Sequence, residues 1–122
     1  GIGKTRSMIA DACYIGCNQM YSLKENRWIS IGTSQNVLYI ATEQDLEECQ
    51  TMCLAFIACV DEEHILKGEY FVGEYERVLK AGQILKNSKI QFECLPDFTM
   101  SMIEGKIKKH IRENQTKYVF NS

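Results

Sequence analysis

Apolar residues recur along the chain in a pattern that alternates between helices and short buried strands. Between Met8 and Met20 they occupy nearly every side of a helix, which is typical of a helix covered on most of its surface. Residues Val37–Ala41 form an unbroken apolar run, the pattern of a strand buried on both faces of a parallel sheet. The pattern therefore predicts an α/β protein whose strands are joined by helical crossovers.

Capping and turn residues predict the other elements. Asp45, with Glu48 three residues further on, has the spacing of a capping box and predicts a helix over residues 45–60. The polar stretch from about 22 to 35 is expected to be an irregular surface loop. The further elements expected are helices near 62–66, near 74–87 and after Thr99, and strands over 89–95 and 117–120.

Composition indicates one ordinary globular domain over residues 1–122. The chain is 45% hydrophobic and 25% charged, and its formal net charge is −2. It has no overall basic field, so contact with nucleic acid would require a local patch. No apolar run approaches the ~20 residues that span a bilayer, and the first residues lack the pattern of a signal peptide. We therefore expect a cytoplasmic protein with no membrane partner.

The cysteines favour core packing over a site. Cys13 and Cys17, like Cys49 and Cys53, are four residues apart within predicted helices, so each pair lies on one helical face. A metal or thiol site is conceivable at such a pair. Reduced cysteine, however, commonly acts as a small buried hydrophobe, which is the interpretation we prefer here.

The first residues carry the most informative motif. Gly3, Lys4 and Thr5 match the last three positions of the phosphate-binding loop G-x-x-x-x-G-K-[ST], directly before a predicted helix. In such a loop the glycine lets the backbone approach phosphate, the lysine neutralises phosphate charge and the hydroxyl joins the Mg²⁺ shell. The residues expected to bind nucleotide are Gly1, Ile2, Gly3, Lys4, Thr5 and Arg6, with Thr5 as the metal ligand.

Glu43 follows the buried strand, and the residues around it leave two interpretations open. A carboxylate at the carboxyl end of a parallel strand can orient the water that attacks a γ-phosphate. Alternatively, Glu43 only adds negative charge near a helix N-terminus, together with Asp45, Glu47 and Glu48.

The chain resembles a known family over nearly its whole length, although only the phosphate loop and the region of Glu43 are motif-like. Residues 37–48, with the sequence VLYIATEQDLEE, resemble the strand, catalytic glutamate and following helix of DnaB-type replicative DNA helicases, including phage-encoded ones. The resemblance implies their C-terminal RecA-like ATPase domain, an α/β P-loop NTPase core with a mainly parallel sheet flanked by helices. That core would be incomplete, because the chain begins inside the phosphate loop and ends at Ser122 where the magnesium-binding aspartate is expected.

The same resemblance implies an activity. The parent protein would be an ATP-dependent DNA helicase that uses ATP and Mg²⁺, forms a homo-hexamer and moves along single-stranded DNA, while the isolated fragment would be inactive. Glu43 and Lys4 would be its catalytic residues in this chain. Two alternatives stay open: a RecA-like ATPase of the recombination or signalling type, and a non-catalytic α/β interaction module.

Overall fold

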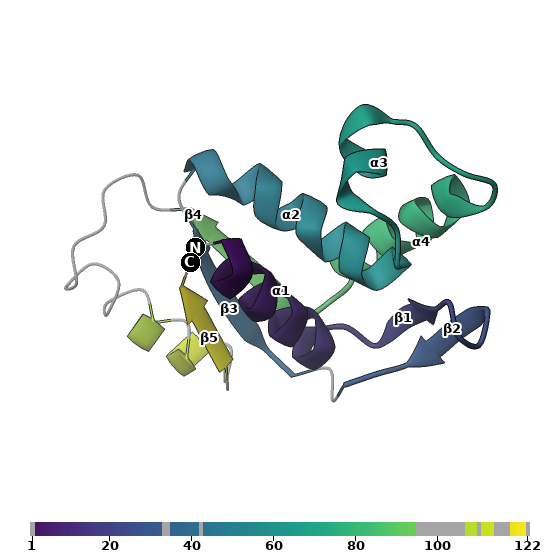
Figure 1. The fold of residues 1–122 in the computed structure, drawn as a ribbon. Helices are drawn as coiled ribbons and strands as arrows, with labels where there is room; N and C mark the ends of the chain where they lie inside the picture. Colours follow the sequence, from purple (N-terminus) through teal and green to yellow (C-terminus); the bar gives the residue numbers. More distant parts are fainter. Residues whose placement is uncertain are drawn as a thin grey trace.

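The computed structural model describes residues 2–32, 35–41, 43–94, 107–109, 111–113 and 118–121. In the described part, one helix is followed by three strands, three further helices and two last strands (Figure 1). Residues 107–109 and 111–113 are also helical. The elements are α1 (Ile2–Gly16), β1 (Gln19–Ser22), β2 (Arg27–Ser30), β3 (Val37–Ala41), α2 (Glu43–Ala58), α3 (Glu62–Lys67), α4 (Glu74–Lys86), β4 (Ile90–Cys94) and β5 (Tyr118–Asn121).

A three-stranded parallel sheet forms the centre of the fold. β3 lies between β4 and β5, and Val37 pairs with Ile90 on one side and with Tyr118 on the other. Every residue of β3 is fully buried, as its uninterrupted apolar run predicts. The boundaries predicted for this strand are confirmed.

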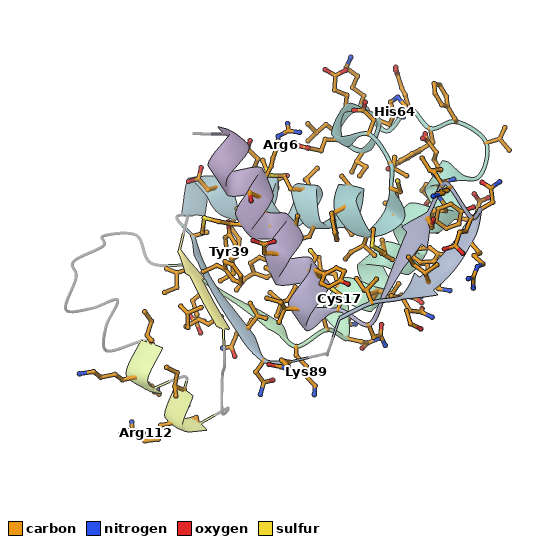
Figure 2. All side chains as sticks on the ribbon, turned by 60° about the horizontal axis from the view of Figure 1, so that its bottom comes forward. Arg6, Cys17, Tyr39, His64, Lys89 and Arg112 are labelled. Carbon is orange, nitrogen blue, oxygen red and sulfur yellow. The ribbon has the colours of Figure 1, made fainter. Side chains whose placement is uncertain are left out.

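Alternate side chains of β3 enter two different cores. Tyr39 faces the larger core, where α1 and α2 lie side by side over the sheet (Figure 2). Its ring lies 5.7 Å from that of Phe92 and 6.2 Å from that of Phe120, measured between centroids. Leu38 and Ile40 face the other side and pack against Ile107. Helical residues therefore cover both faces of the sheet, which explains the absence of polar alternation in this strand.

The expected RecA-like P-loop NTPase core is wrong for the structure observed. The described residues form only three short parallel strands, and β1 and β2 make a separate two-stranded antiparallel sheet. The prediction failed because the order of elements along a chain does not determine how many strands a sheet contains. An order of strands and helical crossovers is shared by many α/β architectures.

The prediction of an irregular loop near 22–35 is also wrong, because a β-hairpin occupies most of this segment. Tyr21 pairs with Trp28 across the hairpin, and their rings meet edge to face at 5.4 Å. The hairpin is anchored on α4, since Arg77 lies 4.5 Å over the Tyr21 ring and Lys80 lies 4.6 Å over the Trp28 ring. Strands of four residues are too short to give a clear pattern of apolar and polar residues, so the sequence did not distinguish them from the polar turn between them.

The helices lie where the sequence predicts them, but several of their ends differ. α1 ends at Gly16, so Met20, which was expected on this helix, lies in β1, and α2 ends at Ala58. α3 and α4 lie where they were expected, whereas α2 begins at Glu43 and includes Asp45, so the predicted capping box is wrong.

The capping acid is found elsewhere: Asp61 begins α3 by accepting a hydrogen bond of 2.9 Å from the Glu63 amide. Thr99, the predicted cap of the helix after β4, lies outside the described residues. Among the helices described, none is long and apolar enough to span a bilayer.

Candidate functional site

Two helices begin at the same edge of the parallel sheet. The parallel pairing brings Ala41, Cys94 and the C-terminal residues of β5 to one edge. α2 begins at this edge with Glu43, two residues after β3 ends. The chain's N-terminus lies beside the carboxyl ends of the strands, so α1 begins there too (Figure 1). In open parallel sheets this edge is where ligands bind.

The predicted phosphate loop falls on the first turn of α1. The backbone from Ile2 to Thr5 is helical, and the first amides of a helix have no carbonyl partner within it. Gly1 lies outside the described residues, as do the side chains of Ile2, Lys4, Thr5 and Glu43. The catalytic roles of Lys4 and Glu43 and the metal role of Thr5 therefore stay predictions.

Arg6 is the predicted nucleotide-binding residue whose side chain is described. Its guanidinium Nη1 lies 2.7 Å from Oε2 of Glu62, at the start of α3. The side chain of Arg6 is 57% exposed and that of Glu62 is 22% exposed. The ion pair is thus close to solvent, where such pairs stabilise proteins only weakly.

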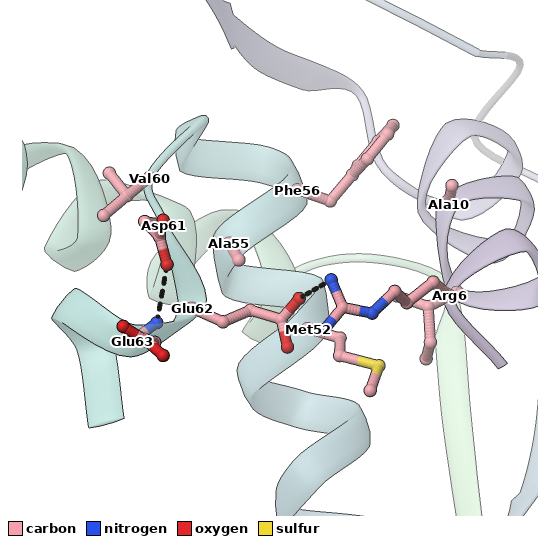
Figure 3. A pocket seen from close by; sticks show the side chains of 10 residues that line it. Arg6, Ala10, Met52, Ala55, Phe56, Val60, Asp61, Glu62 and Glu63 are labelled. Carbon is pink, nitrogen blue, oxygen red and sulfur yellow. Dashed lines mark hydrogen bonds and ion pairs between the residues drawn. The ribbon is translucent and has the colours of Figure 1, made fainter. Parts of the chain in front are cut away.

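A pocket lies beneath this ion pair. It has a volume of about 660 Å³, and Figure 3 shows Arg6 and Glu62 meeting across it above Met52. Ile9, Met52 and Val60 form a buried apolar floor, and carboxylates stand on its rim. The lining residues are Arg6, Ile9, Ala10, Met52, Ala55, Phe56, Val60, Asp61, Glu62 and Glu63.

Sequence reasoning missed this pocket. Its walls come from α1, α2 and the start of α3, and no single stretch of sequence contains them. The one local signal was the run of three acids from Asp61 to Glu63, which stands directly after a predicted helix. That run also serves the N-terminus of α3, so it did not by itself indicate a site.

A buried carboxylate, that of Glu74, joins α3 to α4. Glu74 is 8% exposed, and its Oε1 accepts a 2.8 Å hydrogen bond from the Phe71 amide and lies 2.9 Å from Nδ1 of His64. Burial raises the pKa of Glu74 and is the largest single influence. The Phe71 amide, the His64 ring and the charge of Arg77 together outweigh it, so the pKa of this carboxyl lies below its ordinary value.

The depressed pKa of Glu74 predicts a pH-dependent contribution to stability. The ionised carboxylate is favoured in the folded state, so its contribution is complete above the unfolded pKa near 4.5 and is lost as pH falls through the lower folded pKa. We expect Glu74→Gln to lower the free energy of unfolding by about 2 kcal/mol at pH 7. The difference from wild type should shrink toward pH 3, as measured by urea unfolding.

The exposed Glu76 on the same helix supplies the matched control. Glu76→Gln should change stability by no more than about 0.5 kcal/mol at either pH. A Glu74→Gln deficit of the same size at pH 7 and pH 3 would contradict the depressed pKa.

The cysteine pairs are buried, as core packing requires. Cys13, Cys17, Cys49 and Cys53 are at most 1% exposed. The hydrogen bond with Cys13 and then burial raise the pKa of the Cys17 thiol far above its ordinary value, so the reactive thiolate is suppressed. Within the part of the chain that the structure describes, no three His, Cys, Asp or Glu side chains come together as a metal site.

A comparison with known proteins found one relative that aligns with nearly the whole of this chain. No family model matches the chain. The chain spans about a quarter of the length of the curated relative it matches, since the alignment covers 98% of the chain and 24% of that protein. Over 120 residues the chain is 40% identical to the SPbeta prophage-derived uncharacterized protein YorI of Bacillus subtilis (strain 168).

Proposed function

We propose that this chain is the nucleotide-binding part of an ATP-dependent replicative DNA helicase, with ATP bound at the start of α1. One observation carries the proposal. The helix that begins with the Gly3-Lys4-Thr5 motif and the helix that begins with Glu43 start at the same edge of the parallel sheet (Figure 1). A phosphate-binding group and a water-activating group have to meet at one edge for hydrolysis to occur.

The start of α1 supplies what a phosphate chain needs. The first amides of the helix point outward without intrahelical partners, and the helix dipole favours negative charge at this end. Gly3 adds no side chain that would keep a phosphate from the backbone. Lys4 then supplies a positive charge next to these amides. The proposed ligand at this helix end is therefore the triphosphate of ATP.

Magnesium would be bound together with the nucleotide. The hydroxyl of Thr5 is an oxygen donor of the kind Mg²⁺ accepts, and Mg²⁺ is usually held by few protein groups together with substrate phosphates. One hydroxyl in this chain therefore fits a nucleotide-borne ion. The ion would neutralise charge on the phosphate oxygens.

Glu43 is the proposed base. It stands two residues beyond the end of β3, on the first turn of α2. A carboxylate at that position would accept a hydrogen bond from the attacking water and orient it toward the γ-phosphate. The bound phosphate and the carboxylate would thus lie at the starts of two helices, α1 and α2, on one edge of the sheet.

The whole protein's activity is part of the proposal. We assign it ATP-driven movement along single-stranded DNA as a homo-hexamer in the cytoplasm, on the resemblance of residues 37–48 to the helicase family. The prophage origin of the relative supports a phage-encoded parent. DNA contacts are not assigned to any residue of this chain.

Nucleotide affinity tests the proposal. In the full-length protein we expect Lys4→Ala to weaken Mg²⁺·ATP binding about a hundredfold, because a charge-assisted contact worth about 3 kcal/mol is lost. Isothermal titration calorimetry measures this change. Lys24→Ala, at an exposed turn of the hairpin, is the matched control and should bind as wild type does.

Two outcomes would contradict the proposal. A wild-type protein that binds no nucleotide would leave the α/β chain as a non-catalytic interaction module. Equal affinities of wild type and Lys4→Ala would show that nucleotide binds somewhere other than the start of α1.

A further inference from the structure

We infer that the pocket between α1, α2 and the start of α3 receives the sugar and base of a nucleotide whose phosphates lie at the start of α1. This inference rests on the proposed function and adds the part of the ligand that the phosphate motif does not specify. The pocket has a volume of about 660 Å³, within the range of small-molecule and cofactor sites.

The position of the pocket along α1 is the first argument. Residues three and four apart share one face of a helix, so Arg6, Ile9 and Ala10 lie on the face that continues from Ile2 and Gly3. With a rise of about 1.5 Å per residue, Ala10 lies only about 10 Å along the axis from Gly3. A ligand bound by its phosphates at the helix end can therefore extend along this face into the pocket.

The lining is the second argument. The floor of Ile9, Met52 and Val60 is buried and apolar, and Phe56 is a half-buried aromatic at one wall. Apolar and aromatic surfaces suit the faces of a base, and a nucleotide site generally combines them with a few polar groups. The pocket has that composition.

The rim supplies the polar groups. A carboxylate that accepts hydrogen bonds from ribose hydroxyls is a recurrent feature of nucleotide sites. Asp61 already accepts from the Glu63 amide at 2.9 Å, whereas Glu62 forms an ion pair with Arg6 at the mouth of the pocket (Figure 3). We assign Glu62 to the ribose hydroxyls.

Separating the ion pair at the mouth of the pocket should require little free energy. Arg6 and Glu62 form a partly exposed pair, and such pairs stabilise proteins weakly. Once separated from Glu62, the guanidinium is free to lie over the base, where its flat face stacks favourably. Arg6, which the sequence placed at the nucleotide, would thus contact the base side of the ligand.

The test compares Mg²⁺·ATP with Mg²⁺·tripolyphosphate, which has the phosphates but no sugar or base. Ala55→Phe fills the pocket from α2, and Ala10→Phe fills it from α1. In the full-length protein, each should weaken ATP binding about tenfold in calorimetry and leave tripolyphosphate affinity unchanged. Gln50→Phe, at an exposed position of α2 outside the pocket, should bind both ligands as wild type does. Thermal unfolding by circular dichroism identifies which variants are folded.

Different failures have different meanings. If a folded filled variant binds ATP as wild type does, the sugar and base lie elsewhere, and the phosphate proposal stands. Equal losses for ATP and tripolyphosphate would mean that the substitutions act on the helix end, which also overturns the pocket assignment. If wild type binds neither ligand, the proposed function itself fails and the inference fails with it.

Discussion

Replacing Gly32 with alanine is expected to lower the free energy of unfolding by about 3 kcal/mol or more. Gly32 has a φ of 63°, in the left-handed region that costs other residues about 1–2 kcal/mol. A Cβ at this position would also lie 1.8 Å from the carbonyl oxygen of Tyr14 and 3.1 Å from that of Cys17. Both neighbours are backbone atoms at the end of α1 or just beyond it, so the substitution must move the chain itself.

Gly68 separates the two causes of this loss. It ends α3 with a φ of 68°, nearly the same as that of Gly32, but a Cβ there would have no described atom within 4 Å. Gly68→Ala should therefore cost only about 1 kcal/mol, the backbone part of the effect. Urea unfolding at constant pH measures both variants. Equal losses would mean that the backbone near Tyr14 moves aside without cost.

The sequence predicted the centre of the fold better than its periphery. β3 was predicted to the residue because a strand covered on both faces has to be apolar throughout, and the run from Val37 to Ala41 has no other simple explanation. α3 and α4 were found because Gly68 and Gly73 interrupt the helical pattern. A run of apolar residues indicates burial, and a glycine indicates where a helix ends. Both signals lie within a few residues of the element that they predict.

The errors arise where packing between distant segments decides the structure. β1 and β2 have four residues each and gain their support from Arg77 and Lys80, about fifty residues further along the chain. Asp45 has the spacing of a cap, but α2 extends past it to Glu43. The size of the parallel sheet likewise depends on which strands meet, which the order of elements does not state.

The candidate site also has one part that could be proposed from local sequence and one part that depends on packing between distant segments. The predicted phosphate motif is contiguous, so it could be proposed from five residues at the start of the chain, and its role stays a prediction. The pocket could not, because Arg6, Met52 and Glu62 belong to three separate helices. The partner of Arg6 is more than fifty residues away, and only the packing of α1, α2 and α3 brings the two together.

Glu43→Gln is expected to leave nucleotide affinity nearly unchanged and to slow ATP hydrolysis by the full-length protein about 10²- to 10⁴-fold, the usual effect of removing a general base. Glutamine keeps the size of the side chain but cannot accept a proton from water. The measurements are calorimetric affinity for Mg²⁺·ATP and phosphate release under single-turnover conditions. Unchanged affinity with lost hydrolysis would separate a catalytic role from a binding role.

Glu47→Gln is the control that decides between the two interpretations of Glu43. Glu47 is exposed on the same helix, one turn beyond Glu43. If Glu43 serves only the helix N-terminus, the two substitutions should each lower the free energy of unfolding by about 0.3–1 kcal/mol, and neither should change hydrolysis. If Glu43 is the base, only Glu43→Gln should slow hydrolysis by about 10²-fold or more. Hydrolysis by Glu43→Gln at the wild-type rate would contradict the catalytic role of Glu43. It would not affect the proposal that phosphate binds at the start of α1.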